Sequence, residues 1–337
     1  MTIEKVTSLF RRRKTWMTIG GLLILAVLFY YGSIHGIDIG SFLSRTMILA
    51  TPLTLGTLGE IYAERSGVLN LGIEGMMATG AAVGVIGAFM AKSAVVGALL
   101  GMVSGGVLAL GFGLVTINFK GMQVPAGLGL FLFGLGLSGV IGRPYVGLDL
   151  PYNFSPAPVP VLSEIPVLGE FLFSHGPLVY LALALVPIMW FILFKTKLGL
   201  HIRSVGEDPG AADSAGVNVT RIRYLCVIIG GILAGLGGAF LSLSWTPGWT
   251  EGMSAGRGWI VIALTIFALW NPLRALMGAW LFGGIFALQY QFQGMGIPVR
   301  ILGMFPYLIT IVALALVLIF YERIGAPSAL LKPYERE

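Results

Sequence analysis

Apolar residues run along this chain in long blocks that are separated by short polar stretches. A helix that crosses a bilayer needs about 20 largely apolar residues, because each residue adds about 1.5 Å across a hydrocarbon core of about 30 Å. The pattern therefore predicts an all-α polytopic membrane protein with about ten transmembrane helices. The predicted spans are residues 17–34, 47–62, 73–91, 95–118, 127–142, 178–194, 224–245, 258–270, 273–290 and 303–321.

Three of the predicted spans, 47–62, 127–142 and 258–270, are short, and we expect one of them to be broken or re-entrant.

Two of the connections between the predicted spans are long. Residues 143–177 are rich in proline, which favours extended and turn structure, and we place this loop outside. Residues 195–223 form an inside loop that carries the densest basic charge.

The distribution of lysine and arginine tests this topology, because cytoplasmic loops carry an excess of both. Of the 21 basic residues, 16 fall on the side of the N-terminus and 5 on the other side. We therefore expect both termini to be cytoplasmic in a bacterial inner (plasma) membrane. The predicted organisation is a tail at 1–16, one transmembrane domain at 17–321 and a second tail at 322–337.

Composition narrows the function classes. The chain is 56% hydrophobic and 11% charged, whereas soluble domains carry about 25% charged residues. These values exclude a soluble enzyme, and the net charge of +6 fits membrane-flanking residues better than a nucleic-acid interface. A phosphate-binding loop, a metal-binding helix and a nucleophile elbow are all missing from the sequence. We expect no catalysis and no bound cofactor; any ATP and magnesium would be used by a partner subunit.

The inside loop contains a short helix signal. Asp208 is a good N-cap, Pro209 suits the first helical position, and Gly216 fits the left-handed position after the last turn. Small residues such as Ala211 and Ala212 lie between them. So short a helix is marginal alone and needs a packing partner, which could be a groove on another protein. An ordinary capped loop helix is the alternative.

This segment resembles the coupling loop of ABC importer permeases that serve simple sugars, nucleosides and branched-chain amino acids. In that group, a short helix between the sixth and seventh spans docks onto the cytoplasmic ATPase, and the loop 195–223 lies between the same two predicted spans. The resemblance implies that the ATPase-coupling residues lie within the segment 203–219. They are Gly206, Glu207, Asp208, Pro209, Ala211, Ala212, Asp213 and Gly216.

Further blocks strengthen the resemblance, which covers most of residues 45–325. Residues 64–77 read ERSGVLNLGIEGMM, which is similar to a signature of the group. Residues 252–258 read GMSAGRG and are followed by Asn-Pro-Leu at 271–273, similar to a second block. Residues 162–169 and 178–200 resemble the nucleoside permeases that work with basic-membrane-protein-type lipoproteins.

The resemblance implies a type II, vitamin B12 importer-like architecture with an inverted repeat. The chain would form half of a translocation path for nucleosides. The implied partners are a second permease subunit, a cytoplasmic ABC ATPase and a lipid-anchored or periplasmic binding protein. A simple sugar such as ribose or galactose is the alternative cargo, and a secondary transporter is the alternative mechanism.

Polar and aromatic residues near the spans are candidates for the substrate pathway. The group often carries amide side chains where this chain has Met122 and Phe131, so the cargo contacts are expected to differ here. The acids are candidates as well, because charge inside a membrane is costly and often functional. The candidate pathway residues are Asn70, Glu74, Gln123, Phe131 and Trp259.

Three patterns give further expectations. Glu60 and Glu64 share one helix face, while Glu64 and Arg65 are expected to form a local pair in an inside loop. Residues 74–78 and 251–255 echo each other weakly and lie on opposite sides of the membrane in the predicted topology, as an inverted repeat requires. Glycine-rich runs near 101–113 and 230–238 predict closely packed helices.

Overall fold

The computed structural model describes residues 38–293, 298–320 and 325–335. Every named element in this part of the chain is helical, as the apolar blocks predict. The elements are α2 (Ile39–Arg65), α3 (Ile73–Ala91), α4 (Ala94–Gly113), η1 (Leu114–Asn118), α5 (Gln123–Gly142), η2 (Arg143–Tyr145), η3 (Leu162–Glu164), α6 (Leu168–Phe173), α7 (Pro177–Lys195), α8 (Lys197–Glu207), α9 (Pro209–Ser214), α10 (Val219–Phe240), η4 (Leu241–Trp245), α11 (Arg257–Phe267), α12 (Pro272–Gln293), α13 (Val299–Leu302) and α14 (Phe305–Phe320).

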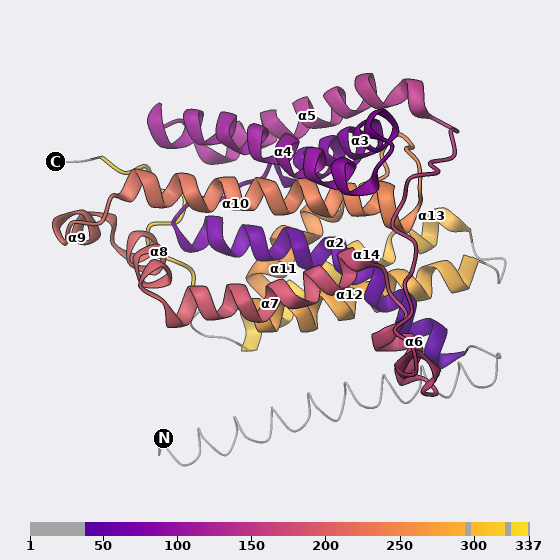
Figure 1. Cartoon of the computed structure of the whole chain (residues 1–337). Helices are drawn as coiled ribbons and strands as arrows, with labels where there is room; N and C mark the ends of the chain where they lie inside the picture. Colours follow the sequence, from indigo (N-terminus) through magenta and orange to yellow (C-terminus); the bar gives the residue numbers. More distant parts are fainter. Residues whose placement is uncertain (1–37, 294–297, 321–324, 336–337) are drawn as a thin grey trace, which may run out of the picture.

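The long helices form one bundle (Figure 1). Helices α2 and α10 run side by side through its middle, with α3, α4 and α5 on one side and α7 and α12 on the other. Helices α8 and α9 lie at one end of the bundle together with residues 325–335, and we call this the α9 end. Helices α6 and α13 lie at the opposite end, the α6 end.

The predicted spans correspond closely to the observed helices. Helix α3 has the predicted bounds, and α4 and α10 continue through the π-helical turns η1 and η4. Among the described residues, five helices are long and apolar enough to cross a membrane: Ile73–Ala91, Ala94–Asn118, Gln123–Tyr145, Pro177–Lys195 and Val219–Trp245. The chain is therefore a multi-pass integral membrane protein. The predicted span 17–34 lies outside the described residues.

Glycines set the spacing between the central helices. A methyl group on Gly105 of α4 would collide with the carbonyl of Gly231, and one on Gly235 of α10 would collide with the carbonyl of Gly101. The two backbones are therefore in contact, which any larger side chain would prevent. The prediction of close packing between the glycine-rich runs is confirmed.

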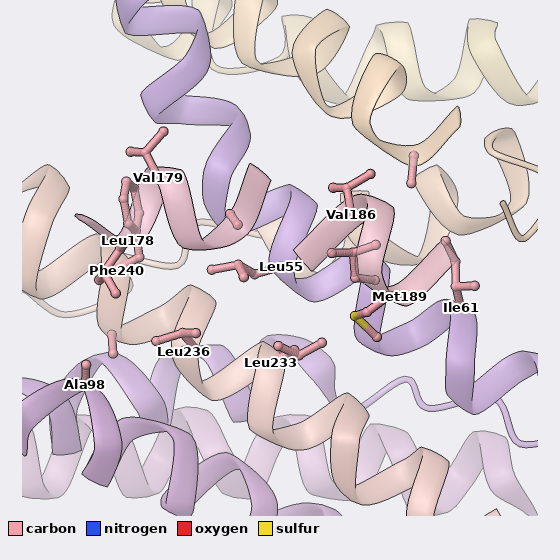
Figure 2. Packing of buried hydrophobic residues seen from close by; sticks show 14 of the residues in the cluster. Leu55, Ile61, Ala98, Leu178, Val179, Val186, Met189, Leu233, Leu236 and Phe240 are labelled. Carbon is pink, nitrogen blue, oxygen red and sulfur yellow. The ribbon is translucent and has the colours of Figure 1, made fainter. Parts of the chain in front are cut away.

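Apolar side chains from α2, α7 and α10 fill the space beside this contact (Figure 2). Val186 and Met189 of α7 lie close to Leu55 of α2, and all three belong to the same buried cluster as Leu233 of α10. The hydroxyl of Tyr62 also donates a hydrogen bond to the carbonyl of Met189 at 2.7 Å. These contacts fix α7 against the centre of the bundle.

The proline-rich connection 143–177 is mostly extended or turn structure, as its prolines predict. It also contains one short helix that the prediction missed, α6. His175 follows α6, is fully buried, and its ring Nε2 lies 2.7 Å from the carbonyl of Phe171. This bond ties the end of α6 to the residues that lead into α7, so a local interaction offsets the extended preference of the prolines.

Candidate functional site

A buried carboxylate holds the start of the short helix α11. Glu74 lies in the first turn of α3 and is 4% exposed. It accepts hydrogen bonds from the backbone N–H groups of Gly256 (2.7 Å) and Gly258 (2.6 Å) and from the hydroxyl of Ser254 (2.7 Å). The positive end of a helix dipole lies at its N-terminus, so the Glu74 carboxylate stabilises this end of α11.

A cation holds the other end of the same helix. The Arg65 guanidinium, at the end of α2, donates to the carbonyls of Leu269 and Trp270, each at 3.4 Å, just beyond the last turn of α11. Helix α11 has 11 residues, which is about 16 Å and half of what a bilayer span requires. It corresponds to residues 258–270, one of the three short spans of which one was expected to be broken or re-entrant.

The contact between Glu74 and residues 254–258 corrects the predicted topology, which put them on opposite sides of the membrane. The N–H of Asn70 donates to the Glu60 carboxylate at 2.9 Å, so the link from α2 to α3 turns back along α2. Because α11 is half-length and ends beside Arg65, its start lies deep in the bundle rather than in an outer loop. The two helix N-termini, of α3 and α11, thus meet inside the protein.

The five candidate pathway residues lie around this meeting point, which we call the Glu74 junction: the contact of α3, α5 and the start of α11. Asn70 accepts a bond from the N–H of Gly72 at 2.9 Å, and Gln123 accepts one from the N–H of Leu69 at 2.8 Å. The rings of Phe131 and Trp259 pack edge to face, with centroids 5.3 Å apart. Glu74 and Gln123 therefore make buried polar contacts between distant segments, whereas the side-chain oxygen of Asn70 bonds within the link between α2 and α3.

The acids near the end of α2 are also internal, which corrects the prediction of a local Glu64–Arg65 pair in a loop. Glu60 and Glu64 are 0% and 1% exposed and belong to α2 itself. The indole N–H of Trp270 donates to Glu64 at 2.5 Å. The distant Trp270 supplies the hydrogen bond, and Arg65 bonds instead to the chain beyond α11, so the three residues join α2 to the turn between α11 and α12.

A cavity of about 310 Å³ lies next to the Glu74 junction. Residues of η4, the segment 246–257, α12 and α14 line it, on the side toward α13 and the α6 end. Arg257 links the two places, because its neighbours Gly256 and Gly258 bond to Glu74 while its own side chain lines the cavity.

Within the loop 195–223, the short helix that begins after Asp208 forms as the sequence predicts. Asp208 caps α9 by accepting the N–H of Ala211 at 2.9 Å, Pro209 is the first helical residue, and Gly216 has a φ of +84°. The preceding part of the loop, which was not expected to be helical, forms α8; there the hydroxyl of Thr196 accepts the N–H of Gly199.

The structure divides the predicted coupling residues into two groups. Gly206 and Ala212 are buried: a methyl group on Gly206 would collide with the carbonyl of Arg65, and Ala212 packs with Val205 and Val219. The others lie on the outside of the loop, with Asp213 and Pro209 partly covered. The exposed ones are Glu207, Asp208, Ala211 and Gly216, beside exposed Gly210, Ser214 and Ala215.

Residues 325–335 support this loop from behind, a role that sequence reasoning missed. The N–H of Ala329 donates to the carbonyl of Gly206 at 2.9 Å, and the hydroxyl of Ser328 donates to the carboxylate of Glu207 at 2.9 Å. The Arg223 guanidinium donates to the carbonyls of Ser66 and Lys332. No local pattern announces these contacts, because they join residues that are more than a hundred positions apart.

Comparisons with known proteins agree with this architecture. Residues 42–320 match the family described as branched-chain amino acid transport system / permease component. The chain is 37% identical over 309 residues to a guanosine ABC transporter permease protein of Bacillus subtilis, which covers 86% of this chain and 94% of that protein. It is 33% identical to a nucleoside ABC transporter permease protein of Lactococcus lactis, over 85% of this chain and 94% of that protein.

A third relative is named for a sugar. The chain is 40% identical to a putative glucose ABC transporter permease protein of Haloferax volcanii, over 88% of this chain and 97% of that protein. No solved structure matches the chain. The family match covers most of the chain, and these relatives are matched over nearly their whole length. The chain therefore belongs to the branched-chain amino acid transport system permease family and is a permease subunit of an ABC transporter.

Proposed function

We propose that this permease imports nucleosides and forms half of their path through the cell membrane. The observation that carries the proposal is the similarity, over nearly full length, to permeases named for guanosine and for nucleosides. A simple sugar is the second candidate, because the relative named for glucose is 40% identical. A secondary transporter is not favoured, because Glu74, the acid it would use, already accepts three hydrogen bonds from the protein.

Its partners would be those of an ABC importer. Two permease proteins of Bacillus subtilis are named for guanosine, and this chain is 37% identical to one and 26% identical to the other. Two nucleoside permease proteins of Lactococcus lactis also match it, one at 33% over 300 residues and the other at 32% over 125 residues. These pairs support a second, paralogous permease subunit here. A separate ATPase would hydrolyse ATP, and a lipid-anchored or periplasmic protein would deliver the cargo.

The α9 end would face the cytoplasm and the ATPase, with both termini and the tails 1–16 and 322–337 on that side. The remaining spans of the domain 17–321 would complete a type II permease of about ten helices. The meeting of the α3 and α11 N-termini supports an inverted repeat, because such repeats often place half-helix N-termini at the centre of a transporter. Asn70, Glu74, Gln123, Phe131 and Trp259 would then lie beside the path.

The exposed side of α9 would be the surface that docks on the ATPase. It presents small side chains at Gly210, Ala211, Ser214 and Ala215, which let a helix enter a groove closely. Glu207, Asp208, Pro209, Asp213 and Gly216 would surround this contact, whereas buried Gly206 and Ala212 would hold the helix in place from behind. Closure of the ATPase would then bias the arrangement of the spans through this helix.

Cargo is tested by uptake in cells that lack this gene, with radiolabelled guanosine and adenosine against ribose, galactose and glucose. We expect the deletion to remove nucleoside uptake and the gene to restore it. Loss of sugar uptake alone would retain the ABC mechanism and overturn the cargo.

Coupling is tested with Ala211→Trp, which places a large ring on the exposed side of α9. Because Ala211 is exposed, the variant should fold and reach the membrane at wild-type abundance but retain little uptake and little bound ATPase. Ala157→Trp, at an exposed alanine whose N–H bonds to the carbonyl of His175 just after α6, is the matched control and should retain the ATPase. Normal ATPase binding and uptake in Ala211→Trp would contradict the docking surface.

A further inference from the structure

Two side chains that line the cavity beside the Glu74 junction each carry a buried hydrogen-bonding atom without a partner among the described residues. Arg257 is 3% exposed, and its Nη1 donates to the carbonyls of Met253 (3.2 Å) and Ser254 (3.1 Å). Within the described part of the chain, its Nε is buried without a hydrogen-bond partner, and so is Oε1 of Gln289 on α12. Both side chains line the cavity. A buried polar atom without a partner is destabilising, so an unpaired donor and an unpaired acceptor on two side chains that line one cavity point to a ligand that pairs with both.

The walls of the cavity are aromatic. Trp245 and Tyr290 pack against each other with ring centroids 5.7 Å apart, and Phe286 lies under the Arg257 guanidinium at 4.9 Å. Tyr307 of α14 completes the lining and donates a hydrogen bond to the carbonyl of Ala255 at 2.7 Å. Such rings favour a flat, apolar ligand face over a heavily hydrated one.

We infer that this cavity is a recognition site for the base of a nucleoside, in which Arg257 donates to an acceptor on the edge of the base and Gln289 accepts from a neighbouring N–H. The inference rests on the proposed function and adds where and how the permease reads its cargo. A cavity of about 310 Å³ lies at the lower end of small-molecule sites, which run from about 300 to 1,000 Å³, and so suits a single nucleoside.

Other cargoes of ABC permeases fit this chemistry less well. A free amino acid would place a carboxylate near Arg257, but its ammonium group would find no acidic side chain among the described residues that line the cavity. A hexose carries several hydroxyl groups, each of which needs partners once it leaves water. A nucleobase has a flat face for the rings and an edge on which a donor and an acceptor are adjacent.

The test uses the assembled transporter, with its partner permease, ATPase and binding protein, in cells or proteoliposomes. Initial uptake is measured for guanosine, adenosine, purine riboside (whose base lacks an N–H on this edge), glucose and leucine. Gln289→Leu removes the acceptor. Because Oε1 of Gln289 accepts no hydrogen bond from the described residues, no protein donor loses its partner in this variant. Gln291→Leu is the matched control, because Gln291 also has an unpartnered buried Oε1 on the same helix but does not line the cavity.

We expect Gln289→Leu to lower kcat/KM for guanosine and adenosine about tenfold, the cost of roughly one buried hydrogen bond, while purine riboside is unchanged. Gln291→Leu should leave all three nucleosides as in wild type. Arg257→Lys should lower uptake of all three, because each base has an acceptor. Equal loss for all nucleosides in Gln289→Leu, or no loss in either Gln289→Leu or Arg257→Lys, would overturn the base-reading cavity.

Failure of the proposed function gives a different result. If wild-type transporter carries glucose or leucine and no nucleoside, the cargo proposal fails before any variant is compared. If wild type carries nucleosides and Gln289→Leu behaves like Gln291→Leu, the cargo stands and the cavity inference alone is wrong.

Discussion

The loop 195–223 and the Glu74 junction both depend on side-chain oxygens that bind backbone N–H groups, yet they are built in opposite ways. In the loop, Thr196, Asp208 and Asn218 each accept an N–H three residues further along. At the junction, Glu74 accepts N–H groups 182 and 184 residues away. Loss of a local cap should loosen one short helix, whereas loss of the distant acceptor should separate whole segments of the bundle.

Of the substitutions that test this comparison, replacement of Glu74 should cause the largest loss of folding stability. Glu74→Ala leaves three donors without partners at a buried helix end, and we expect a loss of about 3 kcal/mol or more of folding free energy, with little monodisperse protein. Glu74→Gln retains an acceptor and should be intermediate. Thermal unfolding and size-exclusion profiles of the detergent-solubilised protein measure both.

The control for the junction is Glu251→Ala, which removes an exposed acid at the matching position of the sequence echo. It should unfold at the wild-type temperature. A wild-type unfolding temperature for Glu74→Ala would show that the start of α11 does not depend on this carboxylate.

Removal of a local cap should have a smaller and confined effect. Asp208→Ala is expected to lose about 1 kcal/mol of α9 stability, because the N–H of Ala211 loses its partner. Hydrogen exchange in residues 208–216 should speed up and ATPase binding should weaken, while the unfolding temperature of the bundle stays the same. Asp208→Ser retains a capping oxygen and should restore slow exchange; fast exchange that spreads into α10 would contradict a confined effect.

The smallest effect is expected at the surface pair of Lys120 and Glu335, whose charged atoms are 2.8 Å apart. The hydrogen bond from Lys120 and its charge lower the pKa of Glu335 below the usual 4.5, so any stabilisation is present above that pH and is lost as the pH falls through the lowered value. Glu335→Gln should leave uptake and unfolding unchanged at pH 7, because exposed pairs contribute little. A clear loss would show that residues 325–335 need this pair to support the loop 195–223.

The sequence predicted well what is periodic or local. Apolar blocks predicted nearly all the long helices, and the cap, proline and glycine of α9 predicted its bounds. The same reasoning placed residues 252–258 in an outer loop and Glu64 beside a loop arginine, because hydropathy treats each segment as a simple crossing. Arg257 and Gln289 were not chosen as pathway residues for a related reason: no spacing in the chain shows that they line one cavity.

By itself, the sequence determined a polytopic helical permease and the short helix that would meet its ATPase, since these depend on runs of apolar residues and on partners within four positions. Only the tertiary structure decided that Glu74 and Arg65 hold the two ends of α11, and that Arg257 lines a cavity with Gln289. The physical reason is that α11 is too short to span a bilayer and ends where other helices supply its charges and hydrogen bonds. Those partners lie about two hundred residues away, where no local pattern records them.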